Sequence, residues 1–106
     1  MTSPLKNKWI LITGASSGFG AAAARAFAAE GSKLLLGARR VDRLEQVAAE
    51  SREAGAAEAQ CRALDVCQTT SVDAFVAWAR QTIAPRQPSD ARLDVLINNA
   101  GGALGL

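Results

Sequence analysis

Near its N-terminus the chain carries the segment TGASSGFG, whose residue types and spacing can bind a phosphate group. Its glycines stand at positions 14, 18 and 20, a G-x-x-x-G-x-G pattern that differs from the common G-x-G-x-x-G fingerprint. We expect Gly14 to permit a sharp turn, Gly18 to let the backbone approach a diphosphate, and Gly20 to let a helix lie close to a sheet. The hydroxyls of Ser16 and Ser17 can bind the same oxygens. A glycine-rich turn without a ligand is the alternative.

A second group of candidate residues, Arg39 and Arg40, follows the glycines by about 20 positions. At this place a site for NAD needs a carboxylate that accepts hydrogen bonds from both ribose hydroxyls. The stretch from Lys33 to Val41 contains no acid. Guanidinium groups can instead grip a 2′-phosphate, and each charge-assisted hydrogen bond is worth about 1.5–3 kcal/mol, a preference of about 10- to 150-fold. We therefore predict NADP rather than NAD, with Arg39 as the main contact; two solvated arginines at a helix start are the alternative.

The elements that position these residues are apolar runs that alternate with helical patterns. Short apolar runs predict buried strands, and apolar residues at helical spacing predict helices. The expected strands cover residues 9–13, 34–36, 59–64 and 94–98, and the expected helices cover residues 18–29, 41–54 and 70–83. Asp42 with Glu45, and Thr70 with Asp73, have the spacing of capping boxes at the starts of the last two helices. The segment 84–92, which holds two prolines, predicts a surface loop.

This order of elements, βαβαβαβ, predicts an α/β fold with a parallel sheet and right-handed crossovers. We expect a Rossmann-like doubly wound sheet whose first four strands stand in the order 3-2-1-4, with three helices. The 106 residues fit one small domain. The apolar strand at 94–98 has the character of an interior strand, so we expect a fifth strand beside it. We therefore expect residues 1–106 to be a truncated, partial NAD(P)-binding domain that lacks its C-terminal half and is poorly stable alone.

The composition excludes several classes of protein. A formal charge of +2, with lysines and arginines spread along the chain, gives no reason to expect nucleic acid or an acidic membrane as a partner. No apolar run is long enough to span a bilayer or to form a signal peptide, so we expect a cytoplasmic protein. Cys61 and Cys67 are expected to be reduced, buried small hydrophobes, and without histidine they cannot complete a metal site.

Three features of the chain together resemble the short-chain dehydrogenase/reductase family. TGASSGFG comes first, Asp65 follows the third expected strand, and NNAG at 98–101 follows the fourth, so the resemblance covers nearly the whole chain. SGFG at 17–20 and NNAGGALG at 98–105 are also similar to the branch that acts on serine and other 3-hydroxy acids.

This resemblance implies roles for individual residues. Ala38 stands where an NAD-type member has its aspartate; the Asp65 carboxylate accepts from the adenine amino group, and Val66 packs on the adenine ring. Asn99 to Gly101 line the ribose, while Asn98 ties neighbouring strands together. The expected cofactor-binding residues are Gly14, Ser16, Ser17, Gly18, Phe19, Gly20, Arg39, Arg40, Asp65, Val66, Asn99, Ala100 and Gly101.

The family's catalytic residues cannot be assigned in this chain. The resemblance implies a serine and a Tyr-x-x-x-Lys pair after a fifth strand, but the chain has neither histidine nor tyrosine, the usual proton-transfer side chains. We expect the segment to supply the dinucleotide-binding half of an NADP(H)-dependent oxidoreductase and to be inactive alone. The full-length form would interconvert an alcohol or hydroxy acid and a carbonyl compound, as a homo-oligomer. A non-catalytic NADP-binding module and an inert fragment are the alternatives.

Overall fold

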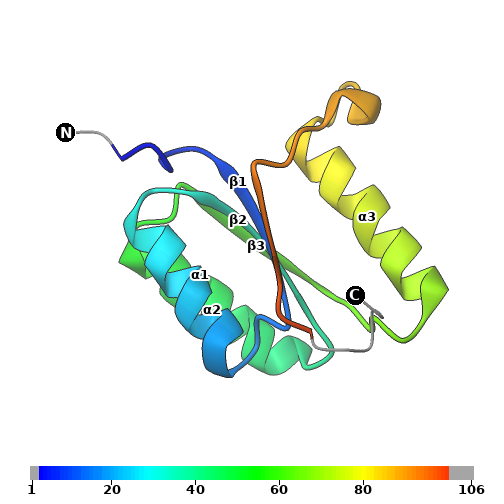
Figure 1. The fold of residues 1–106 in the computed structure, drawn as a ribbon, viewed down its shortest axis with the longest axis horizontal. Coiled ribbons are helices and arrows are strands. Elements are labelled where there is room, and N and C mark those ends of the chain that lie inside the picture. The colour runs from blue at the N-terminus through cyan, green and yellow to red at the C-terminus, as the bar shows by residue number, and fades with distance from the viewer. Residues whose placement is uncertain (1–2, 101–106) are drawn as a thin grey trace.

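Four parallel strands with helices on both faces make up the structure, a computed structural model that describes residues 3–100 (Figure 1). The strand order β3-β2-β1-β4 confirms the predicted topology. Helices α1 and α2 cover one face of the sheet, and α3 lies on the other (Figure 1). The elements are β1 (Trp9–Thr13), α1 (Gly18–Ala29), β2 (Lys33–Ala38), α2 (Val41–Ala54), β3 (Glu58–Ala63), α3 (Thr69–Ile83), the 3₁₀ turn η1 (Pro88–Asp90) and β4 (Val95–Asn98).

The two central strands are buried because both of their faces are covered. Ile10 and Ile12 of β1 point to the side of α1 and α2, where they join one apolar cluster, and Leu11 joins a second cluster on the side of α3. Leu35 of β2 lies in the second cluster with Phe75 of α3. Such burial on both faces explains why these strands are continuous apolar runs in the sequence.

Alanines let α1 pack closely on its neighbours. Ala21, Ala24 and Ala28 recur at helical spacing and are buried in the first cluster. Leu44 and Val47 of α2 lie in the same cluster, so the two helices share one core with the sheet. Among residues 3–100, no helix is long and apolar enough to cross a membrane.

Both predicted capping boxes are wrong. The N-cap of α2 is Arg40 and that of α3 is Gln68, and neither makes a side-chain cap bond. Asp42 and Thr70 lie inside the helices instead, because α2 begins at Val41 and α3 at Thr69. The hydroxyl of Ser71, in the first turn of α3, joins the helix to the preceding turn, because it accepts a hydrogen bond from the Asp65 backbone N–H at 2.9 Å.

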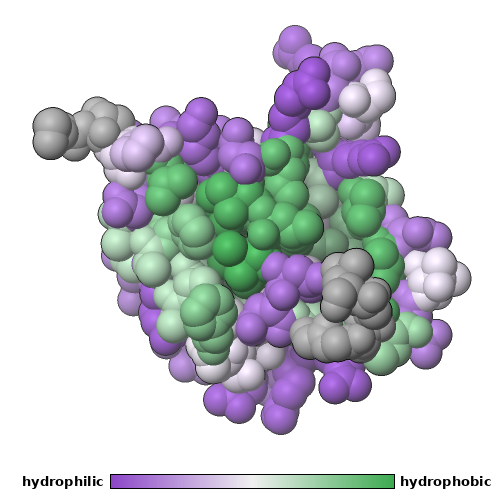
Figure 2. All heavy atoms as spheres, in the orientation of Figure 1, coloured by the Kyte–Doolittle hydropathy of each residue, from purple (hydrophilic) through white to green (hydrophobic). Residues whose placement is uncertain are grey.

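Strand β4 borders an apolar groove. Within residues 3–100 it pairs with β1 alone, and Leu96 is 58% exposed. The groove, a hollow of about 410 Å³, lies between α3 and the sheet, where Figure 2 shows hydrophobic surface in the centre of the view. Phe75 and Val76 line it from α3 and Leu96 from β4. The fifth strand expected beside β4 stays a prediction.

Two buried serines allow a matched test of hydrogen bonding in the core. Ser32 and Ser51 are both 0% exposed, but Ser32 donates to the Leu5 carbonyl at 2.8 Å, whereas the Ser51 hydroxyl has no partner among the described residues. We expect Ser32→Ala to lower the free energy of unfolding by about 1–3 kcal/mol and Ser51→Ala to leave it unchanged or raise it slightly. Urea denaturation measures both values. An equal loss in the two variants would contradict this account.

Candidate dinucleotide-binding site

The register of the sheet brings the predicted site residues to one edge. Thr13 at the end of β1 pairs with Gly37 of β2 and with Asn98 of β4, so the segments that follow these strands leave the sheet at the same level. In parallel α/β sheets, ligands bind at this carboxyl edge. A cavity of about 370 Å³ lies there, lined by Gly14, Ser16, Ser17, Ala38, Arg39, Arg40, Leu64, Asp65, Val66, Cys67, Asn99 and Ala100.

The remaining predicted residues lie around this cavity. Gly18 lines an adjoining hollow, and Phe19 is 70% exposed at the start of α1 without lining either. Gly20 is buried beneath the turn that precedes α1. Gly101 lies outside the described residues.

The hydroxyl of Thr13 holds the loop after β4 in place. It donates to Asn98 Oδ1 at 2.9 Å and accepts from the backbone N–H groups of Asn99 at 3.0 Å and Ala100 at 3.1 Å. All three hydrogen-bonding positions of the hydroxyl are thereby used. The prediction that Asn98 ties neighbouring strands together is confirmed, but sequence reasoning missed Thr13. A hydroxyl residue as the last of a buried strand, directly before a glycine turn, was the available signal.

Two glycines let the turn after β1 interlock with the same loop. Gly14 has a φ of +63°, and a Cβ there would lie 2.8 Å from the Asn99 carbonyl oxygen. A Cβ on Gly20 would overlap the Gly14 carbonyl oxygen and would lie 2.9 Å from Asn99 Nδ2. Without these Cβ atoms, Asn99 Nδ2 donates to the Gly14 carbonyl at 3.2 Å. Turn, helix start and loop therefore form one packed unit.

The start of α1 presents positive potential and free donors to the cavity. Ser17 is the N-cap but makes no side-chain cap bond, so its hydroxyl is not engaged by the helix. The first N–H groups of a helix have no acceptor within it, and they carry the positive end of the helix dipole. The first turn of α1 contains no acid that would neutralise this end. Such a helix start is a ready binding site for phosphate.

Two arginines enlarge this positive potential. Ala38, the last residue of β2, is 6% exposed and is followed by Arg39 and Arg40, which are both exposed. The one ion pair among residues 3–100 joins Arg25 and Glu50, so neither of these two arginines is paired with an acid there. The cavity therefore has unpaired guanidinium groups where β2 ends and no carboxylate at that position.

Asp65 lies in a turn after β3 that lines the same cavity. Its Oδ1 accepts from the Cys67 backbone N–H at 3.0 Å, and its own N–H donates to the Ser71 hydroxyl. This arrangement fixes the carboxylate while its second oxygen can still accept a hydrogen bond. Val66, half-buried, lies beside it in the lining.

The expectation that both cysteines are buried is wrong for Cys67. Its thiol is free and exposed in the cavity lining, because the Asp65 turn leaves it on the surface before α3 begins. Cys61 of β3 is also free but half-buried. Burial raises the pKa of the Cys61 thiol, and the nearby charge of Glu45 raises it further.

Residues 8–105 match the family model described as short chain dehydrogenase. The chain belongs to this family, whose members with assigned roles are oxidoreductases. Serine 3-dehydrogenase of Agrobacterium fabrum is similar to this chain: the two are 43% identical over 96 residues, which are 91% of this chain.

Two solved structures of family members resemble the fold closely. L-sorbose reductase of Gluconobacter frateurii, complexed with NADPH and L-sorbose, has a TM-score of 0.77 and 38% identity over 95% of this chain. A metagenomic short-chain oxidoreductase complexed with NADP has a TM-score of 0.76 and 36% identity over 93% of this chain. The chain spans 34% of the serine dehydrogenase, 36% of the sorbose reductase and 41% of the metagenomic enzyme.

Removal of the Thr13 hydroxyl tests its role in this short-chain dehydrogenase. We expect Thr13→Val to lower the free energy of unfolding by about 1–3 kcal/mol, because the Asn99 and Ala100 N–H groups lose their acceptor. Amide hydrogen exchange should also become faster at these two residues. Thr13→Ser keeps the hydroxyl and is the control, with exchange close to that of the wild type. Equal exchange in the valine and serine variants would show that the hydroxyl does not hold the loop.

Proposed function

We propose that this protein is an NADP(H)-dependent short-chain dehydrogenase/reductase that interconverts an alcohol or hydroxy acid and a carbonyl compound, and that residues 3–100 contribute to its cofactor site. The observation that carries the proposal is the pair of arginines, Arg39 and Arg40, which line the cavity and form no ion pair among residues 3–100. The segment at the end of β2 that contains them has no carboxylate. The NADPH and NADP complexes of the two structural relatives support this choice of cofactor.

The residues of the cavity fit the parts of this cofactor. The start of α1 and the hydroxyls of Ser16 and Ser17 would hold the diphosphate, and Arg39 with Arg40 would hold the 2′-phosphate. The free oxygen of Asp65 would accept from the adenine amino group. Asn99 and Ala100, together with Gly101 beyond the described residues, would line the ribose.

The chemistry divides between the cofactor and the protein. When bound, the nicotinamide ring supplies or accepts the hydride. In our proposal the residues of this chain bind and orient the cofactor, since the 106 residues include no histidine and no tyrosine that could transfer the proton. We expect these 106 residues alone not to turn over a substrate.

The proposed substrate class is a small hydroxy or carbonyl compound. Serine, named for one relative, is a 3-hydroxy amino acid, and the sorbose bound by another is a ketose. Both are small polar molecules that carry at least one hydroxyl group.

A non-catalytic NADP-binding module is the second candidate, and the absence of histidine and tyrosine favours it. Oxidation of NADPH by the full-length form of the protein, in the presence of short hydroxyketones or keto acids, separates the two candidates. Turnover supports the enzyme, while tight NADPH binding without turnover of any such compound supports the module.

Cofactor preference is the direct test of the arginine pair. We expect NADPH to bind at least about tenfold more tightly than NADH, since one charge-assisted hydrogen bond gives this much. Ala38→Asp with Arg39→Leu should reverse the preference, because a carboxylate then accepts from the ribose hydroxyls. Arg39→Leu alone is a second variant, because the buried aspartate of the double variant could disturb folding. Arg86→Leu, on a distant loop, is the control for the loss of one positive charge. Isothermal titration calorimetry measures the dissociation constants. If both variants that lack Arg39 keep the NADPH preference of the wild type, the proposal is refuted.

The exposed thiol of Cys67 offers an independent probe of the cavity. We expect NADPH to slow the alkylation of Cys67 by a maleimide, because the thiol lies in the lining that the cofactor would cover. Cys61 lies outside this cavity, and its raised pKa makes it the slower thiol with or without cofactor. Mass spectrometry after short exposures measures both rates. Equal labelling of Cys67 in the presence and absence of saturating NADPH would place the cofactor elsewhere.

A further inference from the structure

A second cavity adjoins the candidate site on the side of α2. It has a volume of about 330 Å³, and Ser16 and Ser17 line both cavities. These two serines therefore form a wall between the hollow that contains Arg39 and Arg40 and the hollow that contains Arg43. The second hollow is not used by any of the roles proposed above.

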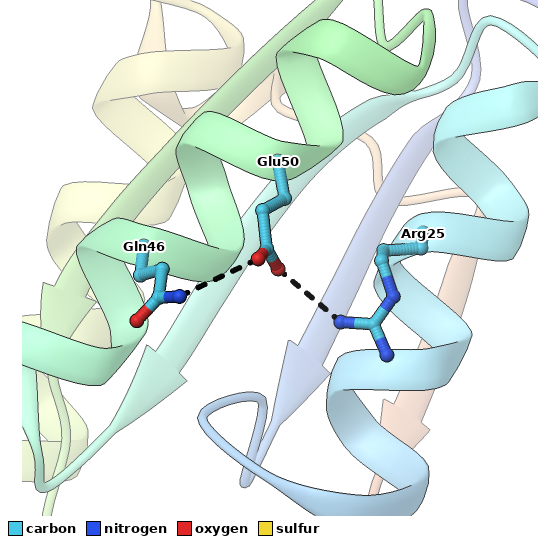
Figure 3. Close-up of polar contacts among 3 residues, drawn as sticks. All are labelled: Arg25, Gln46 and Glu50. Carbon is cyan, nitrogen blue, oxygen red and sulfur yellow. Dashed lines mark hydrogen bonds and ion pairs between the residues drawn. The ribbon is translucent and has the colours of Figure 1, made fainter.

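The negative charge in this second cavity is already neutralised. Glu50 of α2 is the acid in its lining, and one of its carboxylate oxygens lies 3.4 Å from Arg25 of α1. The other oxygen accepts from Gln46 Nε2 at 3.5 Å, so the carboxylate lies between these two side chains (Figure 3). The charges of Arg25 and Glu50 thus largely cancel within the cavity lining.

Arg43 supplies the remaining charge of this lining. It is exposed and forms no ion pair among residues 3–100, although Asp42 and Glu45 are close to it in sequence. It is the third residue of α2, in the first turn, where the helix dipole disfavours a cation. An anion near this position would offset that cost.

The two cavities together place arginines on both sides of the same hydroxyl groups. Arg39 and Arg40, at the end of β2, line one cavity with Ser16 and Ser17, and Arg43 of α2 lines the other with the same two serines. A phosphate monoester carries close to two negative charges and three acceptor oxygens, so it can bind more than one guanidinium group. Its three acceptor oxygens can therefore accommodate a third guanidinium group beside those of Arg39 and Arg40.

We propose that Arg43 is a further specificity-determining residue, which contacts the 2′-phosphate of NADP from the α2 side while Arg39 contacts it from the β2 side. The inference rests on the proposed function, because it assumes that NADP occupies the cavity. In this proposal the second cavity, which Arg43 lines, forms the outer wall of the 2′-phosphate pocket. Arg25 has no such role, because Glu50 engages it.

The test compares dissociation constants for three ligands: NADPH, NADH and adenosine 2′,5′-bisphosphate. We expect Arg43→Gln to weaken NADPH and the bisphosphate about tenfold, the effect of one charge-assisted hydrogen bond, and to leave NADH unchanged. Arg43→Lys keeps the charge without the fork of donors, so its loss should be intermediate. Arg86→Gln removes the same charge from the loop before β4, at the opposite edge of the sheet (Figure 1), and should change none of the three constants.

The outcomes separate this inference from the proposed function. If the wild type does not prefer NADPH to NADH, the proposed function fails. If the wild type prefers NADPH but Arg43→Gln leaves the ratio of the NADH and NADPH constants unchanged, the inference alone is overturned. Equal weakening of NADPH and NADH by Arg43→Gln also overturns it, since a merely structural role of Arg43 would produce that result.

Discussion

The site depends on the three hydrogen bonds of the Thr13 hydroxyl. They join the end of β1 to Asn98, Asn99 and Ala100, and so connect the glycine-rich turn after β1 to the loop after β4. The parallel register makes these bonds possible, because it places Thr13 level with Asn98. The rest of the cavity is arranged around this connection: the turn continues into α1, and the end of β2 lies on the other side of β1.

Much of the fold and of the site could be predicted from sequence, for physical reasons. Strands buried on both faces must be continuous apolar runs, so β1 and β2 were evident, and the glycine spacing marked the turn between β1 and α1. The capping boxes were not predictable, because Arg40 and Gln68 became N-caps through the path of the chain and not through their side chains. The hydrogen bonds of Thr13 to the loop after β4 join segments far apart in sequence, which local patterns do not reveal. The exposure of Cys67 follows from the path of the turn at Asp65, which its residue type does not indicate.

The arginines near the site differ in whether an acidic side chain pairs with them. Arg25 is matched by Glu50 across the α1–α2 contact, whereas Arg39, Arg40 and Arg43 have no acidic partner among residues 3–100. Exposed pairs such as Arg25 and Glu50 add little to stability, but this pair prevents a carboxylate from weakening the positive potential beside Ser16 and Ser17. The arginines without an acidic partner therefore lie on the side of the turn that faces β2 and α2.

The close contact of Gly14 and Gly20 with Asn99 has a consequence for the thermodynamics of ligand association. Because no Cβ atom separates these backbones, the turn after β1 and the first residues after β4 pack as one unit. A ligand that contacts both segments then need not pay to bring them together. Most of the entropic cost falls on the ligand, whose many rotatable bonds are immobilised when it extends along this edge.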